Sequence, residues 1–243
     1  MKIIDLYVVA NIFLFIFFCF TKTAEATWYF PMDRYFERQT VKPFGQLIND
    51  DFYKGKEDLF PFNRFYGYHA GVDLEAFPDE KSKKVPVFTI YSGTVIYIGN
   101  ISGYGGVILQ KLDDENATAL YGHVKITDLS FKVGDHISVT QNPVVLTFLG
   151  DGFSKETSKE RKHLHFGIHK SIDLYFRGHE NSVSDLVSKW NNPSKFLQEK
   201  NAQDPVFVSP SPTSIKKTIK SVERNNNFLY TIINWVKALL KRE

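Results

Sequence analysis

The middle of the chain, from Gly67 to Ile168, consists of short runs of apolar and β-branched residues separated by turn residues. Runs of this length, with glycine, asparagine and aspartate between them, are typical of β-strands and their turns. Because they follow one another at regular spacing, they predict a mainly β fold, a compact antiparallel sheet or sandwich. The expected strands cover residues 85–89, 93–98, 107–112, 118–121, 136–139, 144–149 and 164–168.

The pattern becomes helical toward the carboxyl end of the chain. Short flanking helices are expected over residues 183–190 and 194–200. The final stretch, 228–240, repeats apolar residues at intervals of three and four, which predicts one C-terminal amphipathic helix with a basic polar face. It is too short to span a bilayer and is interrupted by Lys237, so we expect either peripheral membrane contact or packing on the body of the protein.

The amino end has a different character. Lys2 is followed by an apolar stretch from Ile3 to Phe20, and the sequence then closes with Ala24-Glu25-Ala26. These features are typical of a secretory signal peptide, so residues 1–26 are expected to be removed by cleavage after Ala26. The alternative is an uncleaved membrane anchor, because the apolar stretch is nearly long enough to span a bilayer. Either way, the remaining chain is expected to be exported to the periplasm or cell envelope, or secreted.

Composition narrows the functional classes. The chain has 243 residues, of which 43% are hydrophobic and 23% are charged, which excludes disorder throughout. Its net charge is +3, yet residues 206–243 alone hold seven Lys and Arg against two Glu. A basic tail on a mildly acidic body favours an anionic surface over nucleic acid as a partner. The single cysteine, Cys19, lies in the signal stretch, so we expect no disulfide in the mature chain.

The candidate chemistry begins with the pair His163 and His165. Both lie in the run that predicts the strand 164–168, and side chains at i and i+2 leave a strand on the same face. Two adjacent imidazoles suit a metal site or a proton transfer. The alternative is a chance pair of histidines on a solvated face.

Two upstream motifs favour a metal or proton-transfer site over a chance pair. His69 and Asp73 lie four residues apart beside glycines, and His123 follows Gly122 at the end of a predicted strand. A catalytic zinc takes three protein ligands from imidazole and carboxylate groups, so His69, Asp73 and one histidine of the downstream pair would complete a set. Taken singly, His69 and Asp73 could be a hydrogen-bonded loop pair, and His123 a core histidine.

Six short motifs follow one another along the chain: His69-Ala70-Gly71-Val72-Asp73, Ser92-Gly93-Thr94-Val95, Tyr104-Gly105-Gly106, Tyr121-Gly122-His123, Val133-Gly134-Asp135 and His163-Leu164-His165-Phe166. In this order they resemble the M23 family of zinc metallopeptidases, the LytM or lysostaphin-type peptidoglycan endopeptidases. The resemblance implies a compact, mostly antiparallel fold of the LytM type, similar to a duplicated hybrid motif, with the site in a groove on the sheet.

By this resemblance, His69, Asp73 and His165 are the expected zinc ligands, and His123 and His163 are the expected catalytic histidines. Which of these two takes the proton from water and which binds the oxyanion stays open. One departure from the family pattern is the polar insertion at 153–162, which is longer than usual, strongly charged and expected to be a flexible loop bordering the groove. Substrate preference is therefore not carried over from the family.

The resemblance also sets the expected organisation and function. An irregular lead-in (27–65) precedes an M23-like peptidase domain (66–200), a linker (201–227) and the basic amphipathic helix (228–243). We expect a monomeric, exported zinc endopeptidase that cleaves peptidoglycan cross-links or stem peptides and binds no nucleic acid. The alternatives are a non-catalytic LytM-like module that regulates another wall hydrolase, and a purely structural zinc site. The last is disfavoured because structural sites are usually rich in cysteine.

Overall fold

The structure of the chain is a computed structural model that describes residues 27–38, 40–61 and 64–206. The predicted signal peptide, most of the predicted linker and the predicted C-terminal helix lie outside the described residues. Within the described part, no helix has the length and apolar character needed to cross a membrane.

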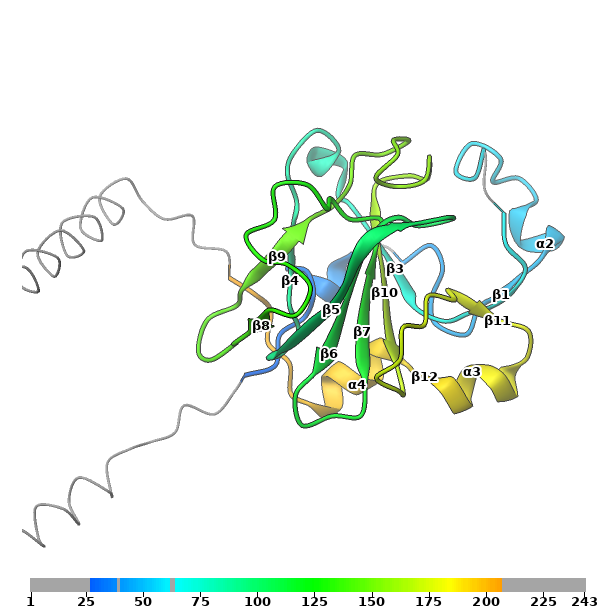
Figure 1. The fold of residues 1–243 in the computed structure, drawn as a ribbon. Helices are drawn as coiled ribbons and strands as arrows, with labels where there is room; N and C mark the ends of the chain where they lie inside the picture. Colours follow the sequence, from blue (N-terminus) through cyan, green and yellow to red (C-terminus); the bar gives the residue numbers. More distant parts are fainter. Residues whose placement is uncertain (1–26, 39, 62–63, 207–243) are drawn as a thin grey trace, which may run out of the picture. The chain divides into compact units, whose positions relative to one another are not determined.

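A seven-stranded antiparallel sheet forms the centre of the domain (Figure 1). β10 is its key strand because it pairs with β7 along one edge and with β3 and β12 along the other. The strands run in the order β12 (Trp190–Asn191), β10 (His163–His169), β7 (Thr118–Gly122), β6 (Gly105–Leu112), β5 (Gly93–Ile101) and β8 (His136–Ile137), with β3 (Val72–Glu75) joined to β10.

Smaller elements surround this sheet. Figure 1 shows α2 and β1 to one side of the large sheet, near β11, and α4 at the end of the sheet where β6 and β7 are joined. The short helices are η1 (Tyr35–Glu37), α2 (Asp50–Tyr53), η2 (Pro78–Glu80), α3 (Val183–Lys189) and α4 (Pro193–Glu199). The remaining strands form two small antiparallel sheets, β1 (Leu47–Ile48) with β2 (Gly67–His69) and β11 (His179–Glu180), and β4 (Pro86–Phe88) with β9 (Val145–Phe148).

The central strands are buried on both faces of the sheet. Along β6, Ile108 belongs to one apolar cluster, whereas its neighbours Val107 and Leu109 belong to another. In β7, Tyr121 and Leu120 divide in the same way. Alternate side chains of a strand point to opposite faces, so two apolar layers explain why these runs are nearly continuous in hydrophobicity. This double burial makes β6, β7 and β10 a rigid base for the residues at their ends.

The mainly β, antiparallel fold class predicted from the sequence is confirmed. Each of the seven predicted strands overlaps an observed one, and both flanking helices are present within a residue or two of the expected bounds. The helices begin where capping residues allow it. Ser182 accepts a hydrogen bond from the Asp185 N–H (3.0 Å), and Asn192 accepts one from the Lys195 N–H (3.3 Å).

The lead-in packs beside the metal-ligand segment of the domain. Ile48, Tyr53 and Phe60 form a small apolar cluster of their own. Upstream of that cluster, the backbone carbonyl of Lys42 accepts a hydrogen bond from the Asp73 N–H (3.1 Å). The lead-in therefore reaches the edge of β3 and delivers the Lys42 side chain to the surroundings of Asp73.

The insertion at 153–162 contains buried residues that its polar composition did not predict. Thr157, Glu160 and Arg161 are buried, and the Thr157 hydroxyl donates to the carbonyl of Asp151 (3.1 Å). The charged side chain of Arg161 contacts Asp73 and Glu75 on β3, and composition alone cannot reveal such contacts. The expectation that this segment borders the groove agrees with its position, because Glu160 lines the pocket at the site.

Candidate metal centre

Strand register brings the predicted metal ligands together. β10 lies between β3 and β7, so His165 stands opposite both Asp73 and Gly122. His69 is the last residue of β2. Two residues later, the backbone at Gly71 passes so close to the His165 ring that an added Cβ would lie only 2.7 Å from His165 Nε2. A side chain at position 71 would therefore push the ligand segment away from β10.

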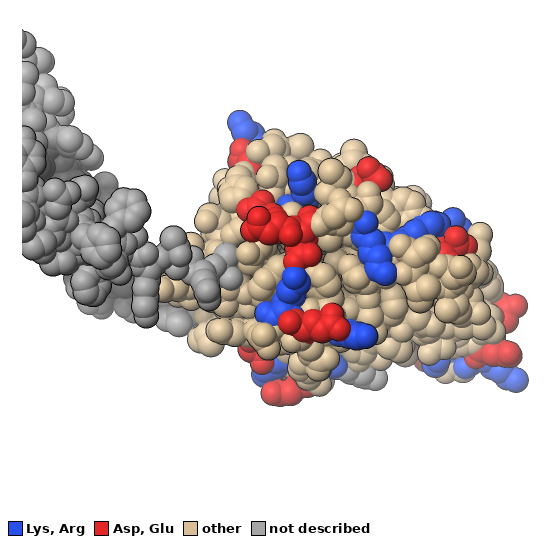
Figure 2. Space-filling model, turned by 90° about the horizontal axis from the view of Figure 1, so that it is seen from below, with Lys and Arg blue, Asp and Glu red and all other residues tan. Residues whose placement is uncertain are grey.

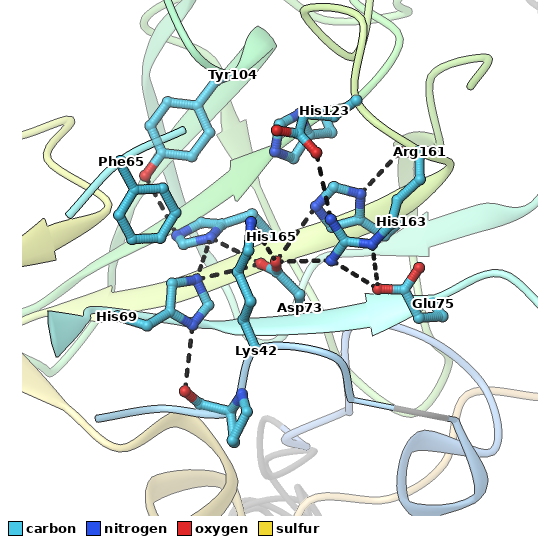
Figure 3. A network of polar contacts seen from close by, with 12 residues as sticks. Lys42, Phe65, His69, Asp73, Glu75, Tyr104, His123, Arg161, His163 and His165 are labelled. Carbon is cyan, nitrogen blue, oxygen red and sulfur yellow. Dashed lines mark hydrogen bonds and ion pairs between the residues drawn. The ribbon is translucent and has the colours of Figure 1, made fainter. Parts of the chain in front are cut away.

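Three donor atoms converge at this point (Figure 3). His69 Nε2 lies 3.0 Å from His165 Nδ1, and Asp73 Oδ1 lies 3.2 Å from the former and 3.1 Å from the latter. All three side chains are buried. His69, Asp73 and His165 thus form a triangle of nitrogen and oxygen donors.

The outward contacts of the two histidines leave a lone pair on each inward-facing nitrogen. His69 Nδ1 donates to the carbonyl of Pro43 (3.3 Å), so its Nε2 carries the lone pair. His165 Nε2 lies 3.2 Å from the Tyr104 hydroxyl; when it donates there, its Nδ1 carries the lone pair. Metal-ligating histidines usually donate their second ring N–H to such a partner, which fixes the tautomer and the ring orientation.

This donor set fits zinc. Tetrahedral zinc with ligand bonds of about 2.0–2.1 Å separates its ligand atoms by roughly 3.3 Å, close to the spacing of these three atoms. Two imidazoles and one carboxylate also match the ligand chemistry of catalytic zinc, which leaves the fourth position to water or substrate. Without a cation, lone pairs of three atoms would face one another inside the protein, which is unfavourable.

The second oxygen of Asp73 has cationic partners. Arg161 Nη2 lies 2.9 Å from Asp73 Oδ2, and Lys42 Nζ lies 3.8 Å from it. Burial alone would raise the pKa of the Asp73 carboxyl, but contacts with His69, His163 and His165 outweigh burial and hold that pKa well below its ordinary value. Asp73 is therefore an anion. Its Oδ1 points at the two histidine donors, and its Oδ2 contacts Arg161 and Lys42.

Arg161 also contacts Glu75, on the strand that carries Asp73. The Arg161 guanidinium lies 2.8 Å from Glu75 Oε1, and both side chains are largely shielded from solvent. Burial raises the pKa of Glu75 to about 7, against the opposing effect of Arg161. Burial likewise lowers the pKa of the Lys42 ammonium, which the charge of Asp73 opposes. Several charges are thus buried behind the donor triangle and depend on one another.

His123 and His163 stand beside the triangle, and a backbone carbonyl holds Nδ1 of each. His163 Nδ1 donates to the carbonyl of Arg161 (2.8 Å), and His123 Nδ1 donates to the carbonyl of Thr157 (3.1 Å). The two rings lie 4.3 Å apart, and His163 Nε2 is 3.5 Å from Asp73 Oδ2. Burial lowers the pKa of His123 to about 3 and that of His163 well below its ordinary value. Both imidazoles are therefore neutral at neutral pH, with Nε2 as a proton acceptor.

We expect His123→Gln to reduce the pH dependence of stability of the metal-free protein. The folded-state pKa of His123 lies below its unfolded value of about 6.5, so its contribution is present at neutral pH and is lost as pH falls. Between pH 7.5 and pH 5 this loss is about 2 kcal/mol. Urea unfolding at both pH values, with a chelator present, measures it.

His136→Gln is the matched control, because His136 is exposed and contacts only a partly exposed carboxylate, that of Asp113. The control should keep the pH dependence of the wild type to within about 0.5 kcal/mol. An unchanged pH dependence in His123→Gln would contradict the assignment of His123 as a buried neutral imidazole.

The structure brings all five predicted site residues to one place. Lys42, Tyr104 and Arg161 are additional residues of the site that sequence reasoning did not assign. Tyr104 lies in a quoted motif, yet nothing in the sequence pairs its hydroxyl with His165. His179, which the sequence analysis did not assign to the site, lies opposite His69 at the rim of the pocket. Register and ring contacts, rather than motif spacing, reveal these partners.

A pocket of about 410 Å³ opens over the donor triangle. His69, Asp73, His123 and His165 form part of its lining, and the lead-in contributes Lys42 and Phe65. The site is therefore a concave cavity with polar groups at its base and aromatic side chains in its wall, the usual form of a small-molecule or peptide site.

Comparison with known proteins agrees with this geometry. Residues 67–181 match the profile of Peptidase family M23. All five site residues predicted from the sequence lie inside that segment, whereas Lys42 and Phe65 lie before it. No curated protein matches the chain in sequence.

Solved structures of similar fold include peptidase domains and a protein complex. The catalytic domain of the antimicrobial peptidase lysostaphin from Staphylococcus simulans is 21% identical, covers 67% of this chain and 93% of its own, and gives a TM-score of 0.44. LytU is also 21% identical, covers 67% of this chain and 86% of its own, and gives a TM-score of 0.42. A chain of the SpoIIIAH and SpoIIQ complex is 22% identical, covers 70% of this chain and 99% of its own, and gives a TM-score of 0.45. Residues 67–181, which carry most of the antiparallel sheet and all five predicted site residues, match peptidase family M23.

Proposed function

We propose that this protein is an exported zinc endopeptidase that hydrolyses peptide bonds in peptidoglycan cross-links or stem peptides. The observation that carries the proposal is the triangle of His69 Nε2, Asp73 Oδ1 and His165 Nδ1, with separations of 3.0–3.2 Å. The match of residues 67–181 to a peptidase family supports the reaction class. The signal-like amino end supports export.

A zinc ion held by His69, Asp73 and His165 would polarise a peptide carbonyl and make water acidic enough to act as a nucleophile near neutral pH. His163 is the better placed proton acceptor, because Asp73 Oδ2 lies 3.5 Å from its Nε2 and would stabilise the imidazolium. The same Nε2–H can then protonate the leaving amine. His123 presents a second acceptor nitrogen next to it, suited to hold and orient a substrate N–H.

Charge on the molecular surface agrees with a peptide or wall substrate. Figure 2 shows a face on which Lys and Arg alternate with Asp and Glu rather than gathering in one basic area. A nucleic-acid reader would need a continuous basic stripe to follow phosphates. This face of the described domain offers none.

The test is incubation of the zinc-loaded protein with defined wall peptides, followed by mass analysis of the products. We expect cleavage that stops on chelation, returns when zinc is added, and is absent from His165→Ala. His136→Ala serves as the control for an imidazole outside the site and should cleave normally.

A zinc-loaded protein that cleaves none of these peptides would contradict the endopeptidase proposal. It would favour the alternative of a non-catalytic module that regulates another wall hydrolase. For such a module, His69→Ala would leave the cellular role intact, whereas for an enzyme it would abolish that role.

A further inference from the structure

Two arginines at the rim of the metal pocket form no ion pair with any carboxylate among the described residues. Arg64 and Arg177 both line the pocket. The Arg64 guanidinium lies over the ring of Tyr53 (4.9 Å), and Arg177 Nη2 donates to Asn181 Oδ1 (2.8 Å). Neither arginine forms an ion pair with a carboxylate of residues 27–38, 40–61 or 64–206.

The fold holds the two arginine-bearing segments against each other. Phe65, next to Arg64, stacks on His179 with ring centroids 4.9 Å apart and planes tilted by 20°. His179 lies two residues after Arg177 and pairs with His69 across β11 and β2. Both guanidinium-bearing segments are therefore fixed at the same rim, next to a strand that supplies a metal ligand.

The remaining charges of the pocket do not neutralise these arginines. Its lining contains two carboxylates, and each is already engaged. Asp73 faces the donor triangle and Arg161, and Glu160 lies 3.3 Å from Arg161. Lys42 adds a third cation to the lining, and a bound zinc would add further positive charge. The pocket is thus built to receive an anionic group.

We propose that Arg64 and Arg177 bind a free carboxylate of the peptide substrate, so that the enzyme selects peptides carrying a carboxylate close to the scissile bond. This inference rests on the proposed peptidase function and specifies its substrate class. A guanidinium presents paired N–H donors in a plane that matches a carboxylate, which favours this anion. The carboxylate can belong to an acidic side chain or to the carboxyl terminus of the peptide.

The test measures binding without turnover, by isothermal titration calorimetry on the zinc-loaded His163→Ala protein. Three probes are compared: pentaglycine with both ends blocked, pentaglycine with a free carboxyl terminus, and a blocked pentapeptide with glutamate at its centre. At least one carboxylate-bearing probe is expected to bind about tenfold more tightly than the blocked pentaglycine. Which probe gains affinity identifies the source of the carboxylate.

The same comparison in Arg64→Gln/Arg177→Gln, on the His163→Ala background, should remove the tenfold difference. Lys132→Gln, which changes an exposed cation that does not line the pocket, should preserve it. Equal binding of all three probes would overturn the inference, as would a difference that survives replacement of both arginines. Failure of wild-type enzyme to cleave any probe would count against the proposed function alone, because binding is measured separately.

Discussion

Replacing His163 with alanine is expected to lower kcat for cleavage of a wall peptide by about 10²–10⁴-fold, the usual contribution of a positioned proton-transfer group. Zinc content should stay unchanged, because His163 lies outside the donor triangle and its Nδ1 is bonded to the backbone carbonyl of Arg161. The substitution should lower kcat and leave KM nearly unchanged, because the imidazole takes part in proton transfer in the transition state rather than in binding the substrate. Steady-state kinetics and metal analysis of the same preparation measure both quantities.

His136→Ala is again the matched control, and it should retain the wild-type kcat and zinc content. His123→Ala gives a second comparison, and a smaller loss there would support His163 as the principal proton acceptor. A His163→Ala enzyme that keeps its zinc and retains kcat within about threefold would contradict the assigned role.

Arg161→Met is expected to destabilise the metal-free protein by roughly 3–5 kcal/mol, the usual cost of removing one partner from a buried ion pair. Arg161 contacts Asp73, Glu75 and Glu160, so its loss leaves three largely buried carboxylates without this partner. Urea unfolding at pH 8, above the pKa of about 7 for Glu75, shows the full cost. At pH 5.5 the cost should be smaller, because Glu75 can take up a proton in the folded state.

Arg34→Met is the control for this change, because Arg34 is half exposed and contacts Asp33 and Glu80 at the surface. Its cost should stay within about 1 kcal/mol. The double variant Glu75→Gln/Arg161→Met should regain part of the lost stability, because it removes one of the carboxylates left behind. An Arg161→Met protein as stable as Arg34→Met would refute the idea that these buried charges depend on one another.

Local patterns were sufficient to predict five of the seven strands of the central sheet. These five are short β-branched runs bounded by turn residues, and such signals depend on neighbours in sequence. Helices α3 and α4 could be predicted for the same reason, because Ser182 and Asn192 mark their starts. The strands β1, β2, β3, β11 and β12 were missed because each has only two to four residues, too few to show a period. The pairing of β2 with β11 also joins residues more than a hundred positions apart.

In the candidate site, too, the residues in local motifs could be predicted, whereas those placed by tertiary contacts could not. The five predicted residues stand in motifs whose spacing is visible in the chain, and the structure brings these residues together. Arg161 was assigned to a polar loop because nothing local signals that its guanidinium is buried between Asp73 and Glu75, almost ninety residues upstream. Lys42 was missed because its position depends on a backbone hydrogen bond to Asp73. Partners of this kind are decided by tertiary packing, which composition does not encode.

The hydrogen bond from the Asp73 N–H to the Lys42 carbonyl also determines where this domain can be cut for transfer to another protein. Similarity to the family begins at residue 67, yet one wall of the cavity is formed by chain that precedes that boundary. A graft of residues 67–181 onto another protein would carry the donor triangle but lack Lys42, Phe65 and the backbone partner of Asp73. The structural unit that forms the metal pocket is therefore longer than the segment that matches the family, and a transplanted domain should begin before Lys42.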